Sequence, residues 1–375
     1  MIEQIHPLEK FIQALKNPTI TTELSYEPII FRLTTAEQAT FHQFCQVFSI
    51  TIIDHIDRQL EDLVRVQNPS ITDKALRLQQ VEALLKDTEK IAATTNWVYY
   101  PWLQQVVHIL QQADYFSVIT NRNQYKITAA EQITLKQKTI GVIGLSVGGE
   151  AAITVSQEHL CGKIKIADFD ELDLSNLNRL NASVADIGVL KTTISARRIY
   201  LINPYLQVEV FPEGIHETNM HDFLNGLDLL IEECDGLEIK FPIRQVAKSL
   251  KINTIYAADE RGLLSIEPYG YDPDFPIFHG ILKEPQLPRT AFDNDAAFMK
   301  TLAIWCGGWD LISERSRAAL TDMGNKICGY PQLASEARFA AGQLGHVARR
   351  LLLGEQLQPF FQHIDLEELV KVSRQ

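Results

Sequence analysis

The chain has 375 residues, of which 46% are hydrophobic and 22% charged, and its formal net charge is −12. This length provides for two or three packed units with a substantial core, and the acidic balance disfavours a general binder of nucleic-acid backbones. No apolar run approaches the roughly 20 residues that span a bilayer, and no basic segment followed by an apolar one marks a secretory signal.

Five cysteines stand singly in the sequence, an arrangement typical of reduced thiols inside the cell. Because none belongs to a C-x-x-C pair, we expect no structural zinc. The resulting expectation is a cytoplasmic protein with no membrane or nucleic-acid partner. The cysteines are Cys45, Cys161, Cys234, Cys306 and Cys328.

Residues 1–120 have the pattern of a mainly helical domain. Apolar residues recur at helical spacing over 34–66 and over 71–95, and Pro101 is placed to open another helix that runs through Leu110. The stretch 96–120 is rich in aromatic residues, which favours a core or a subunit interface over a ligand cage. We expect this domain to recognise a partner, because the motifs that carry chemistry begin only after it.

Residues 121–375 are expected to form an α/β domain. Strand patterns at "KTIGVIG", "KIKIADFD", "QVEVFP", "LDLLIEEC" and "NTIYAADE" alternate with helical ones. This alternation predicts a doubly wound, mostly parallel, Rossmann-like sheet, whose ligands bind beyond the carboxyl ends of the strands. One edge should therefore hold Gly144–Gly149, Asp168–Asp170, Asp235 and Ala258–Arg261.

The turn after the first of these strands has the spacing of a nucleotide-binding glycine turn. In "GVIGLSVGGEAA" (141–152), Gly144 and Gly149 stand at the outer positions, and Ser146 occupies the middle one. Asp168 ends the next strand, where a carboxylate accepts hydrogen bonds from ribose hydroxyls. Up to this point NAD fits as well as ATP.

The segment after the second strand favours a triphosphate. It contains Asn176, Arg179 and Lys191. Fixed cations neutralise phosphate charge as it redistributes during transfer, whereas a dehydrogenase has no use for them at this place.

The motifs over about residues 120–260 resemble the ThiF/MoeB/ubiquitin-activating-enzyme-like superfamily of adenylating enzymes. They come in the order typical of that superfamily: an arginine before strand one, the D-x-D strand end, S-N-L-x-R, D-I-G-x-x-K, I-N-P, and an aspartate after the next buried strand. In this chain they are Arg122, Asp168 to Asp170, Ser175 to Arg179, Asp186 to Lys191, Ile202 to Pro204, and Asp235.

The resemblance implies a homodimer that uses ATP and Mg²⁺ to activate a carboxylate. Attack on the α-phosphate needs cations and a metal around the leaving pyrophosphate. By the resemblance, Asp168 holds the ribose, Asp235 holds Mg²⁺, and Arg122 reaches the phosphate in the partner subunit. The implied nucleotide-binding residues are Gly144, Ser146, Gly149, Asp168, Asp170, Asn176, Arg179 and Lys191, and the implied catalytic residues are Arg179, Lys191, Asp235 and Arg122.

The substrate is expected to be a peptide. The chain lacks the C-x-x-C pairs of members that load carrier proteins, and the crossover stretch 268–298 holds no acyl-accepting cysteine. Cys306 lies nearest and is expected to be structural. Resemblance to the peptide-modifying members implies activation of a glutamate side chain in a ribosomally made precursor of a pantocin-like antibiotic (a RiPP). Glu260 and Arg261 should lie near the substrate, and His279 is a candidate proton carrier.

Alternative functions stay open at this point. One is an activating enzyme for the C-terminus of a ubiquitin-like or sulfur-carrier protein. An NAD-dependent oxidoreductase would explain the glycine turn and Asp168, but would leave Arg179 and Lys191 without a task. A non-catalytic scaffold that binds nucleotide is the third. Activation as an acyl-adenylate or as an acyl-phosphate is equally open.

Overall fold

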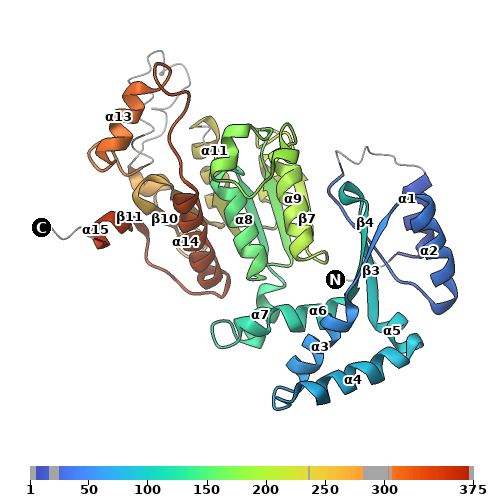
Figure 1. The fold of residues 1–375 in the computed structure, drawn as a ribbon. Coiled ribbons are helices and arrows are strands. Elements are labelled where there is room, and N and C mark those ends of the chain that lie inside the picture. The colour runs from blue at the N-terminus through green and yellow to red at the C-terminus, as the bar shows by residue number, and fades with distance from the viewer. Residues whose placement is uncertain (1–5, 17–24, 235–236, 282–302, 304–305, 371–375) are drawn as a thin grey trace, which may run out of the picture. The chain divides into compact units, whose positions relative to one another are not determined.

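The computed structural model describes residues 6–16, 25–234, 237–281, 303 and 306–370 (Figure 1). The chain divides into two compact units. The first unit comprises residues 1–129 and 196–206, and the second unit comprises residues 130–195 and 207–375.

The first unit contains a four-stranded sheet in the order β1-β3-β4-β2. β3 (Thr95–Tyr100) is antiparallel to β1 (Ile29–Phe31) and to β4 (Gln105–Leu110), whereas β2 (Thr51–Asp54) is parallel to β4. The helices of this unit are α1 (Leu8–Lys16), α2 (Gln38–Val47), α3 (Ile56–Gln67), α4 (Lys74–Lys86), α5 (Thr88–Thr94) and α6 (Gln112–Ile119).

Aromatic rings fill the core of the first unit. Phe11 of α1 stacks on Phe31 of β1 with ring centroids 4.8 Å apart, and Phe41 of α2 lies 4.9 Å from the ring of Trp97. Tyr99 is buried in the same cluster. The expectation that Trp97 and Tyr99 belong to a core is confirmed.

The predicted helix from Pro101 through Leu110 is wrong. Pro101 opens only a short 3-10 turn, Gln104 then adopts a φ of 50°, and the chain returns as β4. β-Branched and aromatic side chains on both arms favour strands, and pairing of β3 with β4 overrides the helix start that proline suggests. The helical pattern predicted over 34–66 is likewise interrupted, because β2 separates α2 from α3.

The second unit is built on a seven-stranded sheet in the order β11-β10-β9-β8-β5-β6-β7. The central strands are parallel, and β10 and β11 add antiparallel pairs at one end. The predicted α/β class with a mostly parallel, Rossmann-like sheet is confirmed. The strands are β5 (Thr139–Ile143), β6 (Lys163–Ala167), β7 (Gln207–Phe211), β8 (Leu229–Glu232), β9 (Asn253–Ala258), β10 (Leu263–Glu267) and β11 (Phe360–His363).

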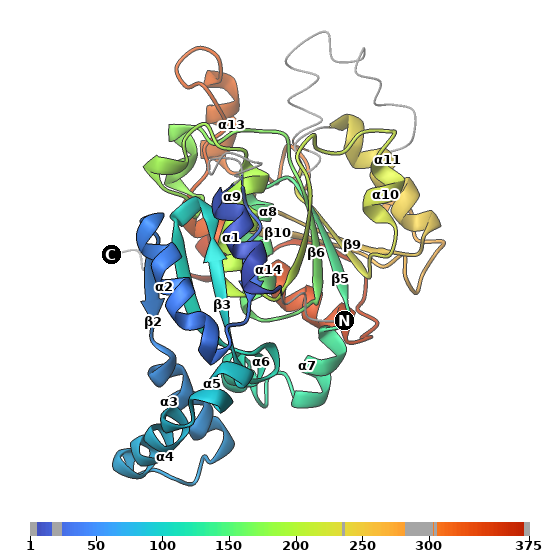
Figure 2. The same cartoon turned by 90° about the vertical axis from the view of Figure 1, so that its right-hand side faces the viewer.

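Helices cover both faces of this sheet (Figure 2). α8 (Val147–Gln157) packs with α14 (Ala334–Leu352) on one face. α10 (Met220–Leu224) and α11 (Leu237–Ser249) pack on the other through a buried apolar cluster that includes Ile143. The other α-helices in the described part of the chain are α7 (Ala129–Leu135), α9 (Lys191–Ile202), α13 (Glu314–Asp322) and α15 (Leu366–Leu369).

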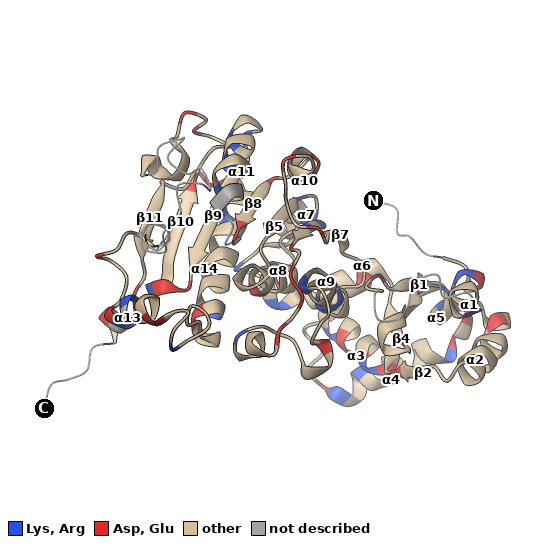
Figure 3. Cartoon of the chain, turned by 90° about the horizontal axis from the view of Figure 1, so that it is seen from above, with Lys and Arg blue, Asp and Glu red and all other residues tan. Residues whose placement is uncertain are grey.

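Charged residues of both signs are interspersed along the helices of both units (Figure 3). Mixed charge of this kind is typical of solvent-facing helix surfaces. Among the residues that the structure describes, no helix is both long and apolar enough to cross a membrane.

Candidate functional site

The glycine turn connects β5 to α8. Gly144 has a φ of 80°, and a Cβ added there would lie 2.5 Å from the backbone oxygen of Glu233. Glycine is therefore required at this position by both backbone conformation and space. Gly149 differs, because a Cβ there would have Ser195 Oγ as its nearest neighbour, at an ordinary contact distance of 3.5 Å.

Ser146 connects the glycine turn to Arg179, one of the cations predicted to bind phosphate. It is the N-cap residue of α8, yet its side chain makes no capping hydrogen bond to that helix. Its hydroxyl instead accepts a hydrogen bond from Nε of Arg179 at 3.3 Å, and Nη1 of Arg179 donates to Oδ1 of Asn178 at 2.9 Å. The structure thus brings Arg179 to the N-terminal end of an 11-residue helix, where the helix dipole attracts anions.

The Asp168 side chain forms hydrogen bonds both with the glycine turn and with the segment that follows β6. Its Oδ2 accepts the backbone N–H of Leu145 at 2.5 Å, and its Oδ1 accepts that of Asp170 at 2.8 Å. Burial raises the pKa of Asp168 above its usual value. Each carboxylate oxygen has room for a second hydrogen bond, so these contacts leave Asp168 able to accept ribose hydroxyls.

Lys191 and Asp170 form an ion pair beside this carboxylate. Nζ of Lys191 lies 2.7 Å from Oδ2 of Asp170, and the backbone N–H of Lys191 donates to the Asp170 carbonyl at 2.9 Å. Asn176 is buried, and its Oδ1 accepts the backbone N–H of Asp173 at 3.0 Å. Its side-chain oxygen therefore closes the 3-10 turn over residues 174–178.

Two predicted site residues do not belong to the described part of the second unit. Arg122 is exposed and lies in the first unit, in the 3-10 turn Asn121–Asn123. Asp235 lies outside the described residues. Within the described part of the chain, no group of three or more His, Cys, Asp or Glu residues is arranged to hold a metal ion.

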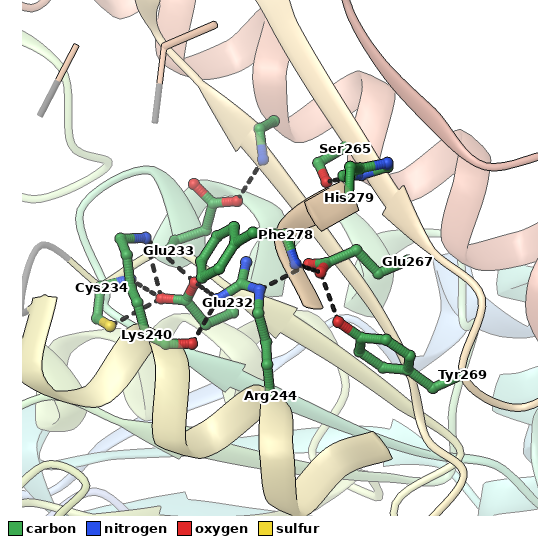
Figure 4. Close-up of polar contacts among 11 residues, drawn as sticks. Glu232, Glu233, Cys234, Lys240, Arg244, Ser265, Glu267, Tyr269, Phe278 and His279 are labelled. Carbon is green, nitrogen blue, oxygen red and sulfur yellow. Dashed lines mark hydrogen bonds and ion pairs between the residues drawn. The ribbon is translucent and has the colours of Figure 1, made fainter. Parts of the chain in front are cut away.

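A buried ionic network lies directly behind the end of β8, and sequence reasoning missed it (Figure 4). Glu232 ends β8, and its carboxylate accepts Nη1 of Arg244 at 2.5 Å and Nζ of Lys240 at 3.1 Å. The same carboxylate accepts the backbone N–H of Cys234 at 3.0 Å and its thiol at 2.7 Å. Glu232 thereby fixes the first residues beyond the strand.

Glu267 completes the network from β10. Its Oε2 accepts Nε of Arg244 at 2.6 Å, and its Oε1 accepts the hydroxyl of Tyr269 at 2.5 Å and the backbone N–H of Phe278 at 2.7 Å. Arg244 also lies over the Phe278 ring, with its Cζ 3.8 Å from the centroid. Two acids and two bases are thus buried together with balanced charge.

The pKa shifts agree with an ionised network. Burial by itself would raise the pKa of Glu232, but the charges of Lys240 and Arg244 lower it to about 2. Burial opposes the charge of Lys240, but the neighbouring Glu232 raises the pKa of this ammonium above its usual value. Opposite charges at hydrogen-bonding distance therefore outweigh desolvation for these groups.

The sequence does carry a signal for this network. Lys240 and Arg244 stand four residues apart on α11, so both lie on one face of the helix. An acid at the end of an apolar strand, followed by two such cations, predicts that the helix pairs with the strand end.

Residues 120–266 match the family model described as the ThiF family. This stretch includes the glycine turn, the ends of β6 and β8, and the helix that carries Lys240 and Arg244.

The chain contains a domain of the ThiF family. The superfamily predicted from the motifs is thereby confirmed. An uncharacterized protein from Mycobacterium tuberculosis is 37% identical over 314 residues, which cover 81% of this chain and 43% of that protein. The tRNA threonylcarbamoyladenosine dehydratase of Haemophilus influenzae is 29% identical over 178 residues, or 44% of this chain and 68% of the enzyme. The chain thus spans less than half the length of its mycobacterial relative.

Other similar proteins are named as adenylyltransferases that act on molybdopterin synthase or on sulfur carrier proteins. A solved structure of PaaA is similar over 68% of this chain and 72% of that one, with 18% identity and a TM-score of 0.43.

Glu260 and Arg261, at the far end of the ThiF-family domain, are held by other parts of the second unit. Glu260 is buried and accepts the backbone N–H of Ser313 at 2.6 Å and the hydroxyl of Tyr330 at 2.8 Å. Arg261 pairs with Asp365 at 2.6 Å. These contacts give both residues an anchoring role between β9, β10 and the C-terminal elements.

His279 and Cys306 lie beyond the residues that match the ThiF family. Nε2 of His279 is 3.1 Å from the hydroxyl of Ser265, and burial lowers the pKa of this imidazole. The Cys306 carbonyl lies 2.9 Å from Nε2 of His363, and its side chain packs beside Tyr256. These contacts support the expected structural role of Cys306.

Proposed function

We propose that this protein is an ATP-dependent enzyme that activates a carboxylate, as an acyl-adenylate or an acyl-phosphate. The observation that carries the proposal is the meeting of Arg179 with Ser146 at the N-terminus of α8. A helix N-terminus and a guanidinium at one point favour a phosphate group. The ThiF family match and the relatives named as adenylyltransferases support the same chemistry.

We propose a role for each edge residue that fits its position. The turn formed by Gly144, Ser146 and Gly149 binds the phosphates, and Asp168 binds the ribose. Arg179 and Lys191 neutralise charge on the departing phosphates, which is where fixed cations accelerate such a transfer most. Asp170 holds the Lys191 ammonium in place at 2.7 Å, and Asn176 keeps the connecting segment folded.

Mg²⁺ is proposed as a further requirement, with Asp235 as its protein ligand. Magnesium in such sites is held by one or two carboxylates together with phosphate oxygens and water. A group of several protein ligands is therefore not needed for it. When bound, the ion would supply charge neutralisation at the phosphates.

The substrate we propose is a glutamate side chain of a ribosomally made precursor peptide, in the biosynthesis of a pantocin-like natural product. The first unit holds the peptide, and the protein acts as a homodimer in the cytoplasm, with Arg122 reaching the partner's site. The absence of C-x-x-C pairs from the sequence favours this substrate over a carrier protein.

A second candidate is activation of a sulfur-carrier or ubiquitin-like protein. The names of several relatives favour it, since they include a sulfur carrier protein adenylyltransferase and ubiquitin-like modifier-activating enzymes. An NAD-dependent reaction has no comparable support, because it leaves the cations beside the glycine turn without a task.

Calorimetry of the full chain tests the nucleotide. We expect binding of ATP with Mg²⁺ and none of NAD, and NAD binding without ATP binding would overturn the proposal. Candidate peptides and carrier proteins are then compared by the products that they induce. AMP with pyrophosphate indicates an acyl-adenylate, whereas ADP indicates an acyl-phosphate.

Mixed dimers test the shared site. Arg122→Ala and Asp235→Ala subunits should each be inactive, and mixing them should restore part of the activity, because one hybrid site then has both residues. No recovery after confirmed subunit exchange would refute the shared site.

A deletion of the first 115 residues is a poor test of peptide binding. The first unit includes residues 196–206, in which the Tyr200 carbonyl accepts the hydroxyl of Tyr100 at 3.3 Å and the hydroxyl of Tyr205 donates to the Leu110 carbonyl at 2.7 Å. Truncation would remove these partners. Substitutions of exposed residues in the intact chain, followed by peptide titration, avoid the problem.

A further inference from the structure

The side chain of Asn178 contacts Arg179, one of the proposed phosphate-binding cations, and the proposed chemistry gives it no role. Nη1 of Arg179 donates to Oδ1 of Asn178 at 2.9 Å, a shorter contact than the 3.3 Å between Nε of Arg179 and the hydroxyl of Ser146. The Asn178 amide also donates through Nδ2 to the backbone carbonyl of Gln332 at 2.7 Å. An amide has both a donor and an acceptor, so Asn178 connects the guanidinium to a residue 154 positions further along the chain.

Gln332 belongs to a segment, residues 330–332, whose side chains are anchored at the end of β9. Nε2 of Gln332 donates to Oδ2 of Asp259 at 2.9 Å. The hydroxyl of Tyr330 donates to Oε2 of the buried Glu260 at 2.8 Å. The Gln332 carbonyl that Asn178 contacts is therefore held from both sides of the same short segment.

The segment 330–332 connects two strand ends of the carboxyl edge. Its two acidic anchors directly follow β9, whereas Asn178 follows β6, and the sheet order places β8 and β5 between these strands. The segment also lies beyond residues 120–266, which match the ThiF family. Hydrogen bonds thus link a part of the chain outside the family domain to a cation of the nucleotide-binding motifs.

The backbone on both sides of Arg179 is held without this connection. The 3-10 turn over residues 174–178 precedes it, and its capping box is closed by other side chains. On the other side, Oε1 of Glu150, in the first turn of α8, accepts the backbone N–H of Asn181 at 2.6 Å. The Asn178 side chain is therefore not needed to place the backbone, and its two hydrogen bonds act on the orientation of the guanidinium.

We propose that Asn178 and Gln332 are positioning residues, which orient the guanidinium of Arg179 toward the phosphates of a nucleotide bound at the glycine turn. The inference rests on the proposed ATP chemistry and adds to it a segment outside the family domain. A long arginine side chain loses rotamer freedom when it binds a ligand, and orienting it beforehand lowers that cost. Because the amide and the carbonyl that orient it are neutral, the charge of Arg179 stays available to a phosphate.

The competing explanation is that these contacts only fasten the segment 330–332 to the sheet. Two variants of matched size separate the roles. N178L has neither the donor nor the acceptor, and Q332M keeps the backbone carbonyl but loses the hydrogen bond with Asp259. If the contacts only fasten the segment, both variants should lose stability without a specific loss of affinity for phosphates.

The experiment is calorimetric titration of the intact protein with ATP and Mg²⁺, and with adenosine as the matched ligand that lacks phosphates. N178L should bind ATP about tenfold more weakly than the wild type, since a hydrogen bond to a charged group contributes that much. Q332M should bind it about threefold more weakly, because the contacted carbonyl stays and only a neighbouring hydrogen bond is lost. Adenosine affinity should be unchanged in both. In an R179A background N178L should cause no further loss, because Asn178 acts through Arg179.

Equal ATP affinity in N178L and wild type would overturn the positioning role and leave the ATP proposal intact. A loss that ATP and adenosine share, or one that is just as large in the R179A background, would overturn it as well. Failure of the wild type to bind ATP would overturn both proposals. Thermal unfolding without nucleotide identifies the variants that are folded, and Q332M decides by the same criteria if N178L does not fold.

Discussion

Two groups of charged residues in the second unit differ in what surrounds them. In the network behind β8, the side chains of Arg244, Glu232 and Glu267 are fully buried. At the glycine turn, Lys191 pairs with an Asp170 side chain that is 52% exposed, and Arg179 donates to the neutral groups of Ser146 and Asn178.

This difference shows which cations a ligand can recruit. A buried cation between two carboxylates already has the partners that compensate its desolvation, and it would lose them by turning to a ligand. A cation held by a solvated acid or by neutral oxygens gives up little when a phosphate replaces them. This contrast supports our proposal that the edge binds the nucleotide and that the network serves the fold.

The largest effect on stability is expected from Arg244→Met. The substitution leaves Glu232 and Glu267 buried without their shared cation, and breaking a buried pair in this way costs about 3–5 kcal/mol. Urea denaturation measures it. Arg338→Met on the surface of α14 is the control and should change stability by less than about 0.5 kcal/mol. A loss for Arg244→Met no larger than the control's would show that the network contributes nothing.

The largest effect on activity is expected from Arg179→Ala and Lys191→Ala. Each should reduce turnover about 10²-fold or more if it stabilises charge in the transition state. Release of AMP or ADP in the presence of an active substrate measures turnover. Their unfolding midpoints should stay near that of the wild type, in contrast to Arg244→Met. If these variants were destabilised but kept the wild-type turnover per folded molecule, Arg179 and Lys191 would serve the fold and not the reaction.

The edge was predictable from the sequence, whereas the network was not recognised. Gly144, Asp168 and Asp170 follow buried strands, and parallel strands bring their carboxyl ends together whatever the details of packing. The network needs Glu267, whose place beside Arg244 depends on the antiparallel return of β10 along β9. That pairing has no local signal in the sequence.

The first unit shows the same limit. Its strands β3 and β4 carry β-branched and aromatic side chains that favour strands, but Pro101 between them suggests a helix start, and the pairing of the two strands decides against it. Pro101 therefore begins the turn that connects β3 to β4, and not a helix.

A smaller and gradual loss of folding stability is expected as the pH is lowered. The pKa of Glu232 is lowered to about 2 in the folded protein, against about 4.3 for an unfolded glutamate. Its contribution to stability is therefore complete above about pH 4.3 and is lost as the pH falls toward 2. Urea midpoints measured from pH 6 downward should show this decline, and the decline should be weaker in Glu232→Gln, whatever that variant's stability at pH 6.

The smallest effect on stability is expected from an exposed ion pair that belongs neither to the buried network nor to the edge. Lys326 and Asp322 form an ion pair of 3.0 Å on α13 and its C-terminal turn, with the lysine side chain 69% exposed. Water solvates both charges in the folded and the unfolded protein, so Lys326→Ala should change stability by less than about 0.5 kcal/mol, and added salt should weaken even that. Urea denaturation at low and high salt measures it beside Arg244→Met. A loss comparable to that of Arg244→Met would mean that burial is not what separates the network from other ion pairs of this protein.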